Sequence, residues 1–215
     1  MAPALDSLQE TRLAQGREYR NMSIAVRTMP EGDDRMVVEG YATTFNQPYE
    51  LYSYANHTVM EQVHPQAFAD CDLSDVIMQY DHRGRVYART RNQTLEIRID
   101  AKGLHIAADL GGTEEGRKLY QEIKGGYVDR MSIGFSVESD SRTVTEDHDS
   151  GATTVLRTIL KIKKLYDVSA VSIPANDMTS ISARKLADGV IAGLAEVSRQ
   201  KKIDRLKLKL LLEEI

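Results

Sequence analysis

Apolar and polar side chains alternate along at least six short segments of this 215-residue chain. A period of two places successive side chains on opposite faces of a strand, so each segment predicts a half-buried β-strand. Turn residues such as Ala101-Lys102-Gly103 and Gly111-Gly112 separate the segments, which favours antiparallel neighbours in a barrel or a sandwich. The predicted strands are Met22–Val26, Met36–Phe45, Val76–Tyr80, Leu95–Ile99, Leu104–Ala108 and Met131–Val137.

Three later segments follow other patterns. Apolar residues recur at helical spacing over residues 113–124, between Thr113 and the pair Gly125-Gly126, which predicts a helix there. Residues 138–154 are polar and without periodicity, so we expect an exposed loop or hairpin tip. A long strand pattern then runs over residues 155–173.

Composition excludes several classes of protein. Lys and Arg total 28 against 32 Asp and Glu, a net charge of -4, so no overall basic field attracts nucleic acid. The single Cys71 cannot form an intrachain disulfide or a four-cysteine zinc site, which suits a reducing compartment. No apolar stretch reaches membrane-spanning length, and the polar first 20 residues lack the core of a secretory signal, so we expect no membrane association.

The two ends differ from the middle of the chain. Residues 1–19 are polar and lack apolar periodicity, so we expect a mobile arm or a short exposed helix, with regular structure beginning near Arg20. Residues 184–215 carry eight Lys or Arg against five Asp or Glu, and apolar residues recur every three or four positions. This pattern predicts a helical tail over residues 186–215 that either covers the barrel or binds a partner. The main domain is expected to span residues 20–185.

Histidine is the residue most suited to general-base chemistry near neutral pH, and the chain has five. His82 stands out because it ends a predicted strand just before Arg83-Gly84, where a ring is both supported and exposed. The other four are interpreted as loop, strand-end or surface residues: His57, His64, His105 and His148.

Ser132 is a candidate nucleophile. Because Met131 and Ile133 share the core face of their strand, Ser132 and Gly134 fall on the other face, expected to meet solvent. The missing side chain of Gly134 is expected to leave space for a substrate backbone. A serine at such a position is otherwise simply a polar surface residue.

Asp167 lies within an apolar strand pattern, where an ionised carboxylate needs a partner. That partner is either Lys163, Lys164 or an arginine, or else an imidazole that the carboxylate orients. Together His82, Ser132 and Asp167 are the residue types of a base, a nucleophile and an orienting acid. Their chain order, with no G-x-S-x-G elbow, excludes the chymotrypsin-like, subtilisin-like and α/β-hydrolase arrangements.

Several motifs in this order resemble the prohead maturation proteases of tailed bacteriophages, distant relatives of the herpesvirus assemblins. The resemblance covers residues 20–185 and implies a mainly β (α+β) fold, a compact antiparallel β-barrel with flanking helices. The motifs that carry it are Gly40–Phe45, Glu61 with Ala67-Phe68, Asp81-His82, Met131–Phe135, Asp167–Val171 and Pro174–Asn176.

The resemblance implies a serine endopeptidase without a cofactor, in which His82 is the general base and Ser132 the nucleophile. The third position usually holds Glu in this family, whereas this chain has Asp167, with Glu138 as the fallback. Candidate oxyanion donors are Lys163, Lys164 and nearby backbone amides. The implied substrates are the scaffolding segment of the phage major capsid protein and the protease itself, inside the procapsid in the host cytoplasm, with a homodimer expected by analogy.

Two other functions stay open at this point. One is a non-enzymatic capsid assembly or scaffolding module that keeps the protease-like fold without turnover. The other is a metal-dependent hydrolase that uses His148 with Asp147 and Asp149.

Overall fold

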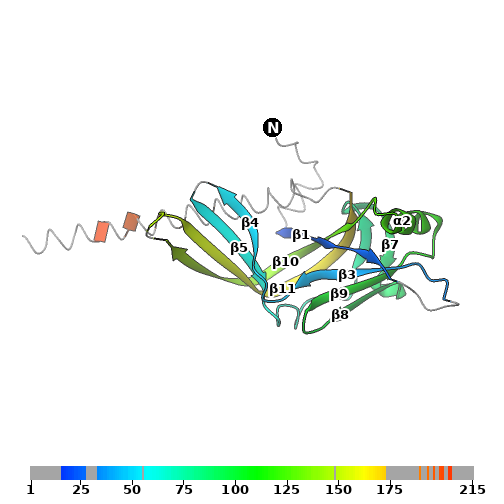
Figure 1. The fold of residues 1–215 in the computed structure, drawn as a ribbon. Coiled ribbons are helices and arrows are strands. Elements are labelled where there is room, and N and C mark those ends of the chain that lie inside the picture. Colours follow the sequence, from blue (N-terminus) through cyan, green and yellow to red (C-terminus); the bar gives the residue numbers. More distant parts are fainter. Residues whose placement is uncertain are drawn as a thin grey trace, which may run out of the picture.

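The computed structural model describes residues 16–27, 33–54, 56–147 and 149–172, together with seven single positions between residues 189 and 204. The described residues up to position 172 form a mainly β fold of two sheets with one α-helix, α2 (Glu114–Lys124), and one short 3-10 turn, η1 (Thr90–Asn92) (Figure 1). None of the described helical residues belongs to a segment long and apolar enough to cross a membrane.

The larger sheet has seven strands built around one long hairpin. Its main path runs β1, β10, β11, β5, β4, while β6 pairs with both β11 and β7. The strands are β1 (Arg17–Ser23), β4 (Tyr49–Tyr54), β5 (His57–Val63), β6 (Ile77–Tyr80), β7 (Arg83–Arg89), β10 (Arg130–Glu146) and β11 (Thr153–Val171).

The smaller sheet has the order β2, β3, β9, β8, formed by β2 (Ala25–Val26), β3 (Val37–Thr44), β9 (Gly103–Asp109) and β8 (Leu95–Ile99). The inward residues of both sheets and of α2 meet in one apolar core, as the alternating pattern predicts. Its members include Phe45, Phe68, Met78, Leu104, Ile106, Leu119, Met131, Ile133 and Leu165.

The predicted helix is confirmed, with its start one residue later than expected. Thr113 precedes α2 and its hydroxyl accepts a hydrogen bond from the Gly116 backbone N–H at 3.0 Å, which satisfies a free donor of the first turn. The six predicted strands are also present, although the first is divided between β1 and β2 and begins at Arg17, earlier than the expected Arg20.

The expected barrel is not found, because the described strands form two sheets without a closed ring. Seven of the nine pairings between described strands are antiparallel, but β11 pairs in parallel with both β5 and β6. These two short strands follow one another along the same edge of β11, at residues 153–159 and 167–170. A 19-residue strand is long enough to hold two partners end to end.

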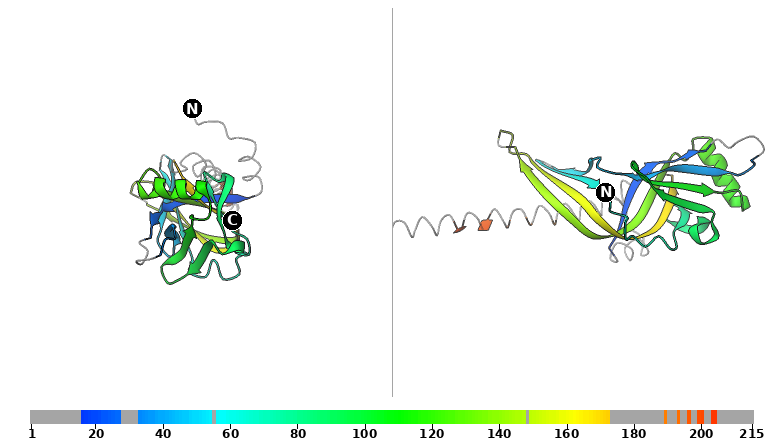
Figure 2. Two further views of the ribbon diagram at one scale, coloured as in Figure 1. Left: turned by 90° about the vertical axis from the view of Figure 1, so that its right-hand side faces the viewer. Right: turned by 90° about the horizontal axis from the view of Figure 1, so that it is seen from below.

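The expected loop at residues 138–154 is mostly strand. β10 continues to Glu146 and β11 begins at Thr153, so only the tip of the hairpin turns (Figure 2). β10 beyond Ser141 is exposed, so the polar sequence carries no core-facing alternation that would predict a strand. Figure 1 shows this part of the hairpin extending away from α2, beside β4 and β5. The alternating pattern also did not predict strands β4, β5 and β7.

Of the predicted arm and tail, little falls within the described residues. Residues 1–15 lie outside them, and the last residues of the expected arm, 17–19, belong to β1. In the tail, the seven described positions are helical: Gly189, Gly193, Glu196, Arg199, Gln200, Ile203 and Asp204.

Candidate active site

His82 lies in the two-residue turn of the β6–β7 hairpin, whose last pair is Tyr80 opposite Arg83. Asp81 and His82 both have positive φ, 49° and 58°, as the central residues of a type I′ turn require. This backbone geometry suits the strand twist but is unfavourable for most side chains. His82 is only 3% exposed, so the expected exposed ring is in fact buried.

Asp167 pairs with this histidine. Its Oδ1 accepts a hydrogen bond from His82 Nδ1 at 2.5 Å and a second from the Ser169 hydroxyl at 2.8 Å. The carboxylate is 2% exposed, so these contacts offset the cost of burying its charge. The imidazole, one of the partners that the sequence left open, is in contact with this carboxylate.

Ser132 lies on the neighbouring strand, opposite Ser169 in the β10–β11 ladder. Opposite residues of an antiparallel pair share a face, with Cα atoms about 5 Å apart, so Ser132 is beside the Asp167–His82 pair. The expectation that Ser132 faces solvent is wrong, because it is 0% exposed. Among the residues that the structure describes, none makes a hydrogen bond with Ser132 Oγ.

Gly134 does not leave open space for a substrate, as the sequence suggested. A Cβ on Gly134 would lie 2.5 Å from Asp167 Oδ2 and 3.0 Å from Tyr19 Cε1, so both side chains occupy the place of the missing one. Tyr19 comes from β1, which pairs with the other edge of β10. Its buried ring meets His82 edge to face, with ring centroids 4.4 Å apart.

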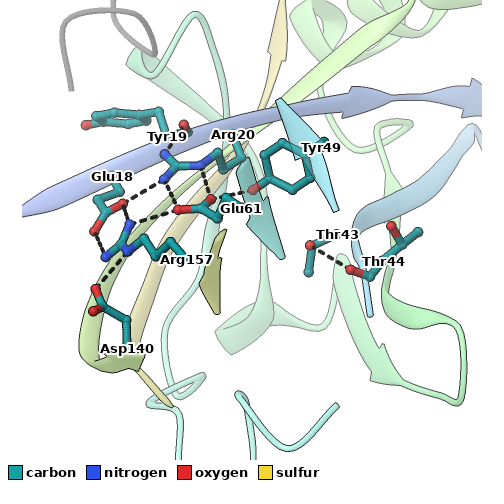
Figure 3. Close-up of polar contacts among 9 residues, drawn as sticks. All are labelled: Glu18, Tyr19, Arg20, Thr43, Thr44, Tyr49, Glu61, Asp140 and Arg157. Atoms are coloured by element: carbon teal, nitrogen blue, oxygen red, sulfur yellow. Dashed lines mark hydrogen bonds and ion pairs between the residues drawn. The ribbon is translucent and has the colours of Figure 1, made fainter. Parts of the chain in front are cut away.

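A second buried polar group, here called the ion cluster, lies among β1, β5, β10 and β11 (Figure 3). Arg20 forms a two-bond pair with Glu61, at 2.5 and 2.7 Å, and Arg157 reaches the same carboxylate at 2.8 Å. Tyr49 also donates its hydroxyl to Glu61. The full cluster is Glu18, Arg20, Glu61, Asp140 and Arg157.

The electrostatics of the ion cluster keep it charged. Burial by itself would raise the pKa of Glu61, but the charge and hydrogen bonds of Arg20, with Arg157, outweigh it and lower that pKa. Burial and the adjacent Glu61 carboxylate raise the pKa of Tyr49, so this phenol stays protonated as a donor. All five charged residues have opposite-sign partners, which makes the cluster a structural element.

Sequence reasoning missed most of this cluster. Glu61 entered only through the resemblance, and Arg20 and Arg157 were not singled out at all. The available signal was a charged residue at an inward position of a strand pattern, as in Val59, Glu61, Val63. Arg157 occupies the same position between buried Val155 and Ile159.

The remaining predicted site residues lie elsewhere. Glu138, the fallback acid, is exposed, and Lys164 donates to Asp72 Oδ2 at 2.5 Å. Lys163 is exposed. Asp147 accepts from the Ser150 hydroxyl at 2.7 Å, while His148 lies outside the described residues. Within the described ranges, no group of three His, Cys, Asp or Glu side chains is arranged to hold a metal ion.

Comparison with known proteins adds the family. A family model described as Caudovirus prohead serine protease matches residues 22–189. The prohead protease of Enterobacteria phage HK97 is 26% identical over 161 residues, which cover 74% of this chain and 65% of that protein. This chain thus spans just under two thirds of the length of that relative.

One solved structure is also similar. The bacteriophage T4 capsid assembly protease matches with 13% identity and a TM-score of 0.38, covering 74% of this chain and 99% of that chain. The family model covers well over half of the present sequence. The chain therefore belongs to the Caudovirus prohead serine protease family.

Proposed function

We propose that this chain is a serine endopeptidase in which Ser132 is the nucleophile, His82 the general base and Asp167 the acid that orients the base. The observation that carries the proposal is the buried hydrogen bond from His82 Nδ1 to Asp167 Oδ1, next to the Ser132 position. A nucleophile, a base and a group that orients the base are the parts that acyl transfer by serine requires.

The proposal gives each nitrogen of the imidazole a separate role. Because the Asp167 carboxylate accepts from Nδ1, that nitrogen carries the proton and Nε2 is the basic one. Nε2 then takes the Ser132 proton as Oγ attacks the scissile carbonyl, and returns it to the leaving amine as the peptide bond breaks. A water deprotonated by the same nitrogen hydrolyses the acyl-enzyme and frees Ser132.

The proposed substrates follow from family membership. We propose that the enzyme cleaves the scaffolding segment of the phage major capsid protein, and itself, during prohead maturation in the procapsid. The HK97 relative is named a prohead protease, which supports this substrate class.

The burial of Ser132 supports a second candidate function. Since Ser132 is 0% exposed, a peptide bond reaches Oγ only after neighbouring side chains move. A chain that stays closed would serve as a non-enzymatic capsid assembly or scaffolding module. The two functions differ in whether any condition produces Ser132-dependent cleavage.

The deciding experiment is intact-mass measurement of purified protein after incubation at high concentration, alone and after co-expression with the capsid protein. We expect the wild type to shorten at discrete sites and Ser132→Ala to stay at full length. Ser136→Ala is the matched control, because Ser136 is also buried on β10 but lies opposite Lys164. Full-length masses for all three proteins under both conditions would overturn the protease and support the assembly module.

A further inference from the structure

The Asp81 side chain makes contacts that the proposed mechanism does not use. Its Oδ1 accepts from the Ser172 backbone N–H at 3.0 Å, and its Oδ2 accepts from the Ser172 hydroxyl at 2.9 Å. The Asp81 backbone N–H also donates to the Ala170 carbonyl at 2.9 Å. Three hydrogen bonds thus join one turn residue to the last residues of β11 and the position just after it.

The turn that these bonds hold is an unfavourable one. Asp81 and His82 are consecutive non-glycine residues with φ of 49° and 58°. The left-handed region disfavours side chains in general, although Asn, Asp and His occupy it more often than other residues. Two such residues in succession still cost conformational energy, so the turn keeps this conformation only when its surroundings determine it.

The strand at the other end of these bonds also carries the acid. β6 runs parallel to β11, with Ile77 opposite Asp167 and Tyr80 opposite Ala170. The Asp81 contacts continue this pairing beyond the end of β6, onto the turn itself. The turn that carries His82 is therefore held by the same strand that carries Asp167.

We propose that Asp81 is a positioning residue that holds the His82 turn on β11 and so sets the contact between His82 Nδ1 and Asp167 Oδ1. This role of Asp81 in catalysis rests on the proposed serine protease function. Its effect on the imidazole–carboxylate contact is measurable without turnover, because that contact exists in the resting protein. Asp81 acts through the turn and does not touch the reacting atoms.

Three variants separate the carboxylate from the backbone. Asp81→Gly removes the acceptors and suits the positive φ, so a loss that it causes does not come from backbone strain. Asp81→Asn tolerates the same φ and keeps an acceptor for the Ser172 N–H, so it serves as the conservative rescue. Asp147→Gly is the matched control, since Asp147 also accepts from a serine hydroxyl, but at the distant tip of the β10–β11 hairpin.

The first readout is the proton resonance of the His82 Nδ1–H, assigned by its loss in Asp167→Ala. A proton shared with a carboxylate resonates far downfield, and we expect this signal in the wild type, Asp81→Asn and Asp147→Gly. In Asp81→Gly it should shift upfield or vanish by exchange, while thermal unfolding shows that the protein remains folded. An unchanged signal in Asp81→Gly would overturn the proposal.

The second readout is the rate at which a fluorophosphonate probe modifies Ser132, followed by intact mass. We expect the rate to fall at least 10-fold in Asp81→Gly and less than 3-fold in Asp81→Asn and Asp147→Gly. Equal rates in the wild type and Asp81→Gly would contradict the role in catalysis. A wild type that never reacts would instead count against the protease function, and the proton signal alone would then decide whether Asp81 positions His82.

Discussion

The molecule contains two buried polar groups that use opposite faces of the same strand. On β1, Tyr19 contacts His82 of the candidate active site, while its neighbours Glu18 and Arg20 enter the ion cluster. In the ion cluster every charge has an opposite partner. In the active site, by contrast, the Ser132 hydroxyl makes no hydrogen bond with any described residue.

Because of this difference, we expect the ion cluster to contribute to stability and the candidate active site to provide reactivity. A buried ion pair whose partners satisfy one another resists change, and removing one partner leaves an uncompensated charge. A buried hydroxyl without a partner lowers stability, but it remains available for proton transfer to a nearby base. We therefore expect substitutions in the active site to reduce activity far more than stability, and substitutions in the ion cluster to do the reverse.

The largest expected effect is that of Asp167→Asn. The amide presents an N–H where the carboxylate accepted one, so His82 loses the protonated Nδ1 that makes Nε2 basic. We expect the rate of Ser132-dependent cleavage to fall by about 10⁴-fold, measured as self-cleavage or probe modification. Asp140→Asn, which removes a carboxylate from the ion cluster, is the control and should keep the wild-type rate. A loss below 10-fold in Asp167→Asn would mean that the carboxylate does not orient the base.

Gly134→Ala should affect both activity and stability. The new methyl group would lie 2.5 Å from Asp167 Oδ2, so the carboxylate or Tyr19 must move. A displacement of about 1 Å at a catalytic group costs about 100-fold in rate, and overpacking a core costs about 1–3 kcal/mol of unfolding free energy.

The control for this change is Gly112→Ala, because a Cβ there would meet no atom within 4 Å. Rates come from cleavage or labelling, and unfolding free energies from urea denaturation. Activity equal to the wild type in Gly134→Ala would show that the tight packing around Asp167 is not needed for function.

Local pattern was sufficient to predict much of the fold. Alternation located β3, β8 and β9 almost to the residue, and the cap at Thr113 located α2, because these elements pack one apolar face against the core. The outer half of the β10–β11 hairpin has no such face, so its strands were read as a loop. Parallel pairing of β11 with β5 and β6 joins residues about 90 positions apart, which local patterns do not encode.

The candidate active site shows the same limit: the local pattern predicted some of its features, and the others depend on the fold. Strand periodicity correctly placed Ser132 and Gly134 on the face opposite Met131 and Ile133. Whether that face meets solvent depends on what else packs there, and Tyr19 comes from a segment expected to be an arm. Likewise, an isolated carboxylate in a strand pattern indicated that Asp167 has a partner, but only the fold determines which one.

Glu61→Gln tests the ion cluster, the second of the two buried polar groups compared above. The amide is neutral, so Arg20 and Arg157 lose the buried carboxylate that they share. We expect the free energy of unfolding near pH 7 to fall by about 3 kcal/mol, as for other broken buried ion pairs. The cleavage rate of the folded protein should change less than 3-fold. A marked loss of rate without loss of stability would place the ion cluster in the catalytic machinery.

The same carboxylate predicts how stability depends on pH. The pKa of Glu61 is lowered in the folded protein, so the folded state binds fewer protons than the unfolded state in the acid range. Its contribution is fully present above the unfolded pKa of about 4.3 and is lost as the pH falls through the lower folded pKa. Urea denaturation between pH 7 and pH 3 should therefore show a steeper acid loss in the wild type than in Glu61→Gln. Parallel curves would contradict this assignment.

The smallest expected effect is that of Lys164→Ala, which tests whether the active site includes this candidate oxyanion donor. The Lys164 ammonium already donates to Asp72 Oδ2 at 2.5 Å, and the pair is partly exposed, so its removal should cost less than about 1 kcal/mol. We expect cleavage or labelling rates within 2-fold of the wild type, and the same for the control Asp72→Asn. Loss of an oxyanion donor would instead lower the rate by about 100-fold or more. A loss of that size in Lys164→Ala, but not in Asp72→Asn, would mean that Lys164 leaves Asp72 during catalysis and that backbone amides are not the only donors.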